Sequence, residues 1–304
     1  MVYIRILLSM IAAFGLSGCS NTPEPAQLDV IREGRPALWK VTGSKPEQGG
    51  AAYLFGTIHI LPKDVHWRTP LLETALKKSD QLIIEVLGLE DTQNAAKIFT
   101  KLALSPNQLE IEKRVKPSLR DDLDAVIDKS NISEFALNRM ESWAAALSLA
   151  SAQTNNLGLD SNEGVEKKLI AQFGELKKPV GGLETIEQQL GYFDTLPEAL
   201  QRDMLISVIE DSSDTKTSFE KLFNAWISGN VDVIVELSSG GILEDPKIRE
   251  KLLVARNRDW TDQLDKKLQN PGIFFVAVGT AHLVGPDAVQ IMLEKRGYKI
   301  QKIQ

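Results

Sequence analysis

The sequence contains one cysteine and only three histidines among 304 residues. A single cysteine cannot form an intrachain disulfide, so a hydrophobic core has to hold the fold together. Four short motifs are missing as well: the G-x-S-x-G nucleophile elbow, the H-E-x-x-H zinc-binding helix, the Walker phosphate loop and G-x-G-x-x-G after a strand. Enzymes built on those motifs are therefore poor explanations for this chain.

Long runs of basic residues are also absent. The chain has 35 lysines and arginines against 41 aspartates and glutamates, which gives a formal net charge of −6. Its lysines occur as scattered pairs, whereas proteins that bind nucleic acids concentrate positive charge. We therefore expect no nucleic-acid partner.

The N-terminus has the features of a secretory signal. One cation, Arg5, precedes an apolar stretch at residues 6–16, which is too short to span a bilayer. Residues 16–19, Leu-Ser-Gly-Cys, resemble the bacterial lipobox, in which cleavage leaves a lipid-modified cysteine as the first residue. We predict a lipoprotein signal peptide over residues 1–18 and lipidation at Cys19, which also removes the only thiol from catalysis.

The predicted anchor indicates a compartment. Ser20 follows the cysteine, which in a Gram-negative protein favours sorting to the outer membrane. We expect a lipid-anchored protein of the bacterial cell envelope, held at the outer membrane and facing the periplasm. Residues 19–34 are polar and contain proline, as in a lipidated flexible tether, and residues 35–304 remain for the folded domain.

The tetrapeptide Gly-Thr-x-His occurs twice, at residues 56–59 and 279–282. Each copy follows an apolar run that predicts a buried strand, and two of the three histidines lie in this pattern. Open α/β sheets collect ligands at the carboxyl ends of their strands, where glycine lets the backbone turn. We therefore expect His59 and His282 to meet in one site, with ring nitrogens about 3–5 Å apart.

The context of the two tetrapeptides repeats too. The first copy is followed by a predicted helix near residues 69–78 and a strand at 81–86, and the second by a helix near 286–295 and a strand at 298–303. We predict an α/β fold with a mixed or largely parallel central sheet, built from two βαβ-like G-x-x-H repeats by internal duplication. A large, mostly helical insertion at about residues 90–270 separates the repeats.

Apolar residues recur at helical spacing through most of the insertion. The predicted helices cover residues 94–104, 116–129, 133–151, 164–173, 197–209, 217–228 and 247–268. One strand interrupts them at residues 178–184, before a helix at 185–192, and it ends in Glu184. A carboxylate at that strand end would face the same crevice as the histidines.

Four side chains are candidates for chemistry: His59, His282, Glu184, and Glu85 at the end of an apolar strand. Burying a carboxylate is costly without a partner, so Glu85 should face a cation or a histidine. Two imidazoles and one carboxylate with an open position are the ligand set of hydrolytic metal centres. The set predicts a divalent metal held by His59, His282 and Glu85, with the second carboxylate as general base or as support for a histidine.

Each candidate also has a purely structural explanation. The histidines could be buried and satisfied by backbone hydrogen bonds, and Glu85 could pair with a lysine or arginine. Glu184 could stabilise the start of the following helix, and Asp160 could cap the next one. Arg256 lies on a charged helical stretch, where a solvated position is the default, and Trp260 at helical spacing fits a core position.

Nine stretches of the sequence carry a family resemblance. They are residues 36–41, 53–62, 82–86, 142–143, 157–160, 178–188, 256–260, 279–287 and 297–298. In this order they resemble a TraB/GumN protein, a relative of the Tiki metalloproteases and, more distantly, of erythromycin esterases and the ChaN haem-binding lipoproteins. The resemblance covers nearly the whole mature chain.

The resemblance implies an α/β sheet core with a helical insertion. In the Tiki branch it implies a divalent metal, manganese or cobalt rather than zinc, near both G-x-x-H motifs and the strand-end glutamate. It also implies that Arg256 or Asn257 lines the same pocket. We predict a lipid-anchored, metal-dependent hydrolase, a peptidase by this resemblance, whose catalytic residues are Glu85, His59, His282, Glu184 and Arg256.

Two other functions remain open. The same residues suffice for a hydrolase without a metal, in which His59 is the general base on a water molecule, as the esterase relatives suggest. The other open function is that of a lipoprotein that binds haem or another ligand without catalysis. The expected substrate in either enzyme is a peptide or a small molecule.

Overall fold

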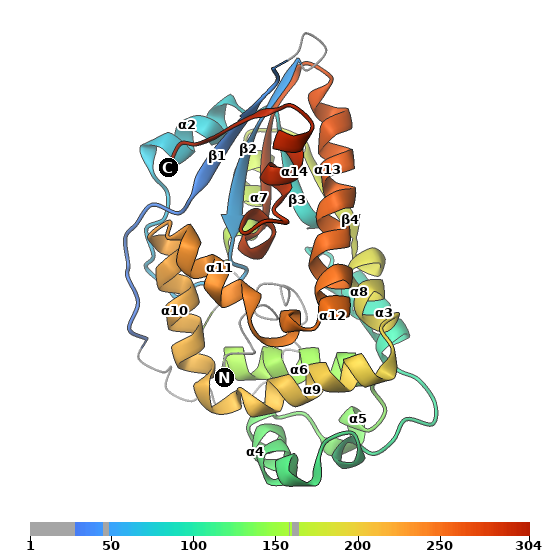
Figure 1. Ribbon diagram of the computed structural model, residues 1–304. Helices are drawn as coiled ribbons and strands as arrows, with labels where there is room; N and C mark the ends of the chain where they lie inside the picture. The colour runs from blue at the N-terminus through green and yellow to red at the C-terminus, as the bar shows by residue number, and fades with distance from the viewer. Residues whose placement is uncertain (1–27, 45–48, 158, 160–163) are drawn as a thin grey trace.

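The computed structural model describes residues 28–44, 49–157, 159 and 164–304. Over these ranges the chain forms a six-stranded sheet with the order β4-β3-β5-β2-β1-β6, and Figure 1 labels four of its strands, β1 to β4. The strands are β1 (Leu38–Thr42), β2 (Gly50–Thr57), β3 (Gln81–Leu87), β4 (Val180–Thr185), β5 (Gly272–Gly279) and β6 (Lys299–Lys302). Four neighbours, β4, β3, β5 and β2, are parallel, and β1 is antiparallel to β2 and β6. The α/β class and the mostly parallel sheet are therefore confirmed.

Helices cover both faces of the sheet, and this is why its strands are apolar on both sides. On one face the core includes α2 (Pro70–Lys78), α7 (Val165–Glu175) and α10 (Thr215–Ile227), and on the other it includes α13 (Ala255–Leu268) and α14 (Val289–Lys295). Successive strand residues point to opposite faces. Phe55 and Phe275 accordingly join the first core, whereas Leu54 and Val276 join the second.

The sheet order brings the two Gly-Thr-x-His segments side by side. β2 and β5 are adjacent and parallel, with Gly56 opposite Val278 and Thr57 opposite Gly279. The crossover from β2 through α2 to β3 passes β5, and the crossover from β5 through α14 to β6 passes β2 and β1. The strands that follow the two segments are thus interleaved in one sheet. The chain after β5 forms a short 3₁₀ helix, Thr280–Leu283, whereas the chain after β2 continues as a loop. The internal duplication stays a prediction.

Most of the chain between β3 and β5 is helical. Its helices are α3 (Thr92–Ala103), α4 (Arg120–Ser130), α5 (Glu134–Leu137), α6 (Ser142–Asn155), α7, α8 (Ile186–Asp194), α9 (Glu198–Glu210), α10, α11 (Val231–Ser239), α12 (Pro246–Arg249) and α13, with β4 among them. None of the helices in the described part of the chain has the length and hydropathy needed to cross a membrane.

Two predicted helices differ from the structure, and one helix was not predicted. The helix expected at 133–151 is two helices, because the chain between them turns so that Asn138 accepts a hydrogen bond from the Ile111 amide through its side chain. α11, a nine-residue helix capped by Asn230, was not expected. The helix expected at 247–268 contains a π-helical segment, Glu250–Val254, immediately before α13.

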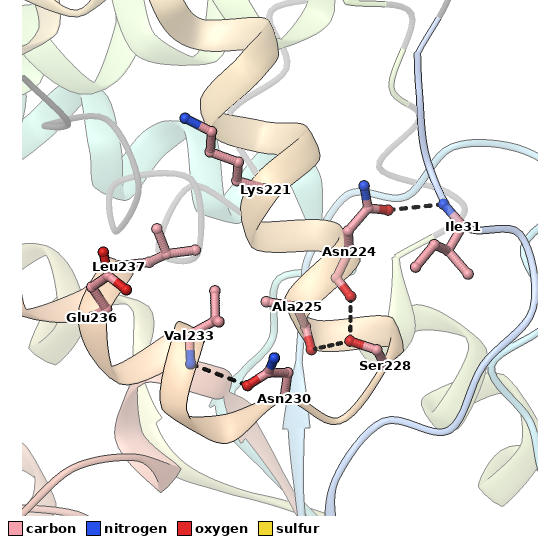
Figure 2. Close-up of a pocket in the computed structure, with 9 residues that line it drawn as sticks. All are labelled: Ile31, Lys221, Asn224, Ala225, Ser228, Asn230, Val233, Glu236 and Leu237. Carbon is pink, nitrogen blue, oxygen red and sulfur yellow. Dashed lines mark hydrogen bonds between the residues drawn. The ribbon is translucent and has the colours of Figure 1, made fainter.

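The segment that precedes β1 is docked rather than free. The tether predicted for residues 19–34 stays a prediction, but several residues between Asp29 and Gly34 are hydrogen-bonded to the domain. The Ile31 amide donates to Asn224 of α10 at 2.8 Å (Figure 2), and the Gly34 amide donates to the His66 carbonyl at 3.1 Å. Residues 19–27 of the predicted tether, Cys19 among them, lie outside the described residues.

The contact between the two motifs can be tested at Gly56. A Cβ there would lie 2.7 Å from the Thr280 hydroxyl and 3.1 Å from Thr280 Cα and Cβ. We expect Gly56→Ala to lower the free energy of unfolding by about 1–3 kcal/mol, because the two strands would have to separate. Urea denaturation measures this change.

Gly174 of α7 supplies the matched control, because no atom lies within 4 Å of the Cβ it would gain. Gly174→Ala should raise stability by about 0.5–1 kcal/mol through helix propensity. Equal stability of Gly56→Ala and wild type would contradict the close approach of the two motifs.

Candidate functional site

Glu85 lies near the carboxyl end of β3 and is 3% exposed. Its Oε1 accepts hydrogen bonds from Arg256 Nη2 at 2.7 Å and from Gln189 Nε2 at 2.8 Å. Its Oε2 accepts from the Gly279 amide at 3.0 Å, at the end of β5. One carboxylate thus connects β3 with β5, α8 and α13, and both of its oxygens are engaged.

Arg256 of α13 is 1% exposed and uses every donor of its guanidinium. Nε and Nη2 donate to the two oxygens of Glu184, each at 2.8 Å, and Nη2 also donates to Glu85. Nη1 donates to the Leu252 carbonyl at 3.1 Å and faces His282 Nε2 at 3.4 Å. An arginine side chain has five N–H groups, and these contacts account for all five.

Glu184 lies near the end of β4, the edge strand beside β3. Besides Arg256, it accepts a hydrogen bond at Oε1 from the indole Nε1 of Trp260 at 2.8 Å. The guanidinium of Arg256 lies 4.9 Å from the Trp260 ring and 5.4 Å from the Tyr192 ring, so aromatic faces enclose it. The cluster is closed by apolar surfaces, which strengthens its charge interactions.

Glu85 and Glu184 share the positive charge of Arg256, but their pKa values shift in opposite directions. Burial raises the pKa of Glu85, but the charges of Arg256, His282 and His59 and the Arg256 hydrogen bond outweigh it and lower the pKa from its usual 4.5 to about 2. Burial also raises the pKa of Glu184, and there Arg256 offsets it only in part. Glu85 is thus firmly ionised, and Glu184 is the carboxylate that takes up a proton more readily.

His282 is buried next to this cluster. Its Nδ1 lies 2.5 Å from the side-chain oxygen of Asn257, and its ring lies 4.2 Å from the Trp260 ring. Burial and then the charge of Arg256 lower the pKa of His282 from 6.5 to about 3, although Glu85 acts in the opposite direction. The imidazole is therefore neutral at physiological pH.

His59 has a different partner. Its Nδ1 lies 2.7 Å from Oε1 of Glu166, on α7, and the Thr57 hydroxyl donates to the same oxygen. His59 also contributes to the electrostatic environment of both Glu85 and His282. The imidazoles of the two motifs are therefore electrostatically coupled. His59 lies beside a carboxylate, whereas His282 is hydrogen-bonded to a side-chain amide.

Four of the five predicted catalytic residues form one connected cluster: Glu85, Glu184, Arg256 and His282. His59 interacts with it electrostatically. A solvated Arg256, the default for a charged helix, is wrong, because two strand-end carboxylates draw it inward. Trp260 is buried as expected but also binds Glu184. Asp160 lies outside the described residues.

Sequence reasoning did not find two polar side chains of the site, Gln189 and Glu166. Thr185 caps the start of α8 through a capping box, and Gln189 lies one turn later. Its side chain therefore reaches Glu85 near the end of β3. Glu166 lies in the first turn of α7, and no motif marks it. Asn257 was expected only from the family resemblance, and here it contacts His282 directly.

A divalent metal at this site would need at least three suitably arranged donors among these side chains. In the described residues no group of three or more His, Cys, Asp and Glu side chains is arranged to hold a metal ion. The oxygens of Glu85 accept from Arg256, Gln189 and the Gly279 amide, and the guanidinium lies where it neutralises both carboxylates. A second cation at Glu85 would meet this fixed positive charge. In this arrangement the residues do not fit the predicted metal.

A surface cavity of about 630 Å³ lies elsewhere, between the docked N-terminal segment and helices α10 and α11. Figure 2 shows Ile31 beside Asn224 at one end and Glu236 and Leu237 at the other. No residue of the Arg256 cluster lines it. The cavity therefore does not belong to the candidate site.

Comparison with known proteins identifies the family. The model of the TraB/PrgY/gumN family matches residues 37–302. The chain belongs to the TraB/PrgY/gumN family. An uncharacterized protein of Treponema pallidum (strain Nichols) is 24% identical over 92% of this chain and 87% of its own length. Uncharacterized proteins YbaP of Shigella flexneri and Escherichia coli (strain K12) are each 25% identical, over 80% and 79% of this chain and 87% of their own length. No solved structure matches.

The role of the guanidinium can be tested with Arg256→Met. Removing one partner of a buried ion pair leaves the other charge without compensation, so we expect a loss of about 3–5 kcal/mol in the free energy of unfolding near neutral pH. Folding lowers the pKa of Glu85 to about 2, so its contribution is complete above 4.5 and is lost as the pH falls towards 2. In the variant Glu85 is protonated more easily. The deficit relative to wild type should therefore shrink as the pH is lowered from neutral to about 4.

Arg258→Met is the matched control, because Arg258 lies two residues after Arg256 on the same helix but is exposed and pairs with exposed Glu250. Its stability should stay close to that of wild type at every pH. An Arg256→Met protein as stable as this control would contradict the account of the cluster.

Proposed function

We propose that the chain is a hydrolase that cleaves an acyl bond in a peptide or a small molecule, with His59 as general base on a water molecule and no divalent metal at Glu85. The observation that carries the proposal is the engagement of both Glu85 oxygens by Arg256, Gln189 and the Gly279 amide. Buried charged groups with shifted pKa values at the carboxyl edge of parallel strands are typical of active sites.

His59 suits the role of base better than His282. A carboxylate beside an imidazole stabilises its protonated form, and Glu166 lies 2.7 Å from His59 Nδ1. The Nε2 atom of His59 lies on the opposite edge of the ring, as in other histidine bases that a carboxylate orients. His282 instead faces the guanidinium of Arg256, which opposes its protonation.

Arg256 supplies the positive charge that a developing oxyanion requires. Its longest contact is the one of 3.4 Å with His282 Nε2. A substrate carbonyl oxygen that replaced this contact would gain a charged donor, while Glu85 and Glu184 kept theirs. The carboxylates hold the guanidinium in place, and the reaction would then need no rearrangement of the buried ion pairs.

The metal-dependent form of the reaction would use a different side-chain arrangement. His59, His282 and Glu85 would hold a manganese or cobalt ion, and Arg256 would first have to release Glu85. The cluster described above favours the metal-free form, because Arg256 already neutralises the carboxylates. Chelation separates the two forms.

Hydrolysis by the purified full-length chain, measured on a panel of fluorogenic peptides and esters, tests the proposal. His59→Ala should lower kcat by about 10²–10⁴-fold, the usual contribution of a general base, and Glu166→Gln should lower it by less. Activity should persist in the presence of a strong chelator. His66→Ala serves as the matched control, because His66 is exposed, and it should keep full activity.

Two outcomes would count against this function. Activity that chelation abolishes and manganese or cobalt restores would support the metal-dependent form. A panel in which His59→Ala hydrolyses substrates as fast as wild type would remove His59 as the base.

We also propose that the chain is lipid-anchored at Cys19 and faces the periplasm from the outer membrane. Residues 1–19 support this, because a short apolar stretch ends in a lipobox-like tetrad that holds the only cysteine. In a Gram-negative host the protein should incorporate labelled palmitate and fractionate with the outer membrane. Cys19→Ala should lose both properties, and Ser20→Asp should keep the lipid but shift to the inner membrane. A Cys19→Ala protein that still carries palmitate would contradict the anchor.

A further inference from the structure

Asn257 is a fully buried amide beside His282 whose orientation is fixed by the backbone. It follows Arg256 on α13, and its Nδ2 lies 2.7 Å from the Asp287 carbonyl and 3.5 Å from the His282 carbonyl. Peptide carbonyls only accept hydrogen bonds, so the NH₂ group must be on this side. The side-chain oxygen of Asn257 therefore faces the other way, towards the His282 ring.

The orientation of Asn257 determines where the proton of His282 lies. The Asn257 oxygen is 2.5 Å from His282 Nδ1, and an amide oxygen can only accept. Nδ1 must therefore carry the hydrogen. Because a neutral imidazole has one N–H, the other nitrogen, Nε2, has a lone pair.

The surroundings of Nε2 agree with this assignment. Nε2 lies 3.4 Å from Nη1 of Arg256, a group that has only hydrogens to offer. If Nε2 carried the hydrogen, the N–H groups of His282 and Arg256 would face each other with no acceptor between them. Burial and the charge of Arg256 also keep the ring neutral, since they lower the pKa of His282 to about 3.

We propose that Asn257 is a positioning residue that holds His282 as the Nδ1-protonated tautomer, so that Nε2 acts as a hydrogen-bond acceptor in the site. The tautomer itself does not depend on the proposed function, but its role in catalysis rests on that function. It assigns the two histidines different tasks, because His282 has no proton on Nε2 to give to a leaving group. A ligand group that displaces Arg256 from Nε2 must itself be a donor, such as an O–H or an N–H.

The three histidines make the tautomer directly measurable. The full-length chain labelled with ¹⁵N in its imidazoles gives three pairs of ring-nitrogen signals, and the pair lost in His282→Ala identifies His282. At about pH 8, where imidazoles are neutral, wild-type His282 should show a protonated, pyrrole-type Nδ1 and an unprotonated, pyridine-type Nε2. Exposed His66 is the internal control and should show averaged tautomers.

Two substitutions at position 257 test the cause. Asn257→Asp keeps an oxygen acceptor, so Nδ1 of His282 should remain protonated. Asn257→Leu removes the acceptor at similar size, so Nδ1 protonation loses its support and the two ring-nitrogen signals of His282 should move towards the averaged positions of mixed tautomers. The signals of His66 should not change in either variant.

The proposal is overturned if wild-type His282 carries its proton on Nε2, or if a folded Asn257→Leu protein keeps the wild-type pattern. Should Asn257→Leu fail to fold, the wild-type spectrum still decides. The spectra do not depend on turnover. A protein with the expected tautomer but no hydrolysis would refute the proposed function alone, and a hydrolase with an Nε2-protonated His282 would refute only the role of Asn257.

Discussion

The guanidinium of Arg256 is the interaction on which the rest of the site depends. Two carboxylates from neighbouring strands are buried beside each other, and such a pair is tolerated only with a well-placed cation and a full set of hydrogen bonds. Arg256 provides five donors from one helix, so it fixes α13 against β3 and β4. Arg256 also contacts the π-helical segment that precedes α13, because its Nη1 donates a hydrogen bond to the Leu252 carbonyl. Such segments recur at functional sites.

A repeated tetrapeptide has produced two chemically distinct histidines. The adjacent, parallel strands β2 and β5 bring Gly56 against Thr280, and the amide of Gly279 donates to Glu85, so the two glycines serve different contacts. His59 lies against a carboxylate, whereas His282 lies between an amide and a guanidinium. The difference arises outside the motifs, from α7 and α13. Proximity of the imidazoles comes from the sheet, and their chemistry comes from the helices.

The sequence predicted those strands whose positions follow from short stretches of apolar residues. Apolar runs and the strand-end glycines located β2, β5 and β3, together with His59, His282 and Glu85. Arg256 could not be placed in this way, because Arg256-Asn257-Arg258 looks like a solvated helix face and its burial depends on carboxylates 72 and 171 residues away. Glu166 and Gln189 could not be predicted either, because their partners, His59 and Glu85, are also distant in the sequence. The docking of Asp29–Gly34 depends likewise on α10, which is remote in sequence.

The central claim is that a guanidinium, and not a metal ion, neutralises the strand-end carboxylates. A crystal structure of the wild-type protein grown with manganese, with anomalous data collected, tests it most directly. The account predicts Arg256 between Glu85 and Glu184 and no anomalous peak at Glu85. A manganese ion bonded to Glu85, His59 and His282, with Arg256 turned away, would contradict it.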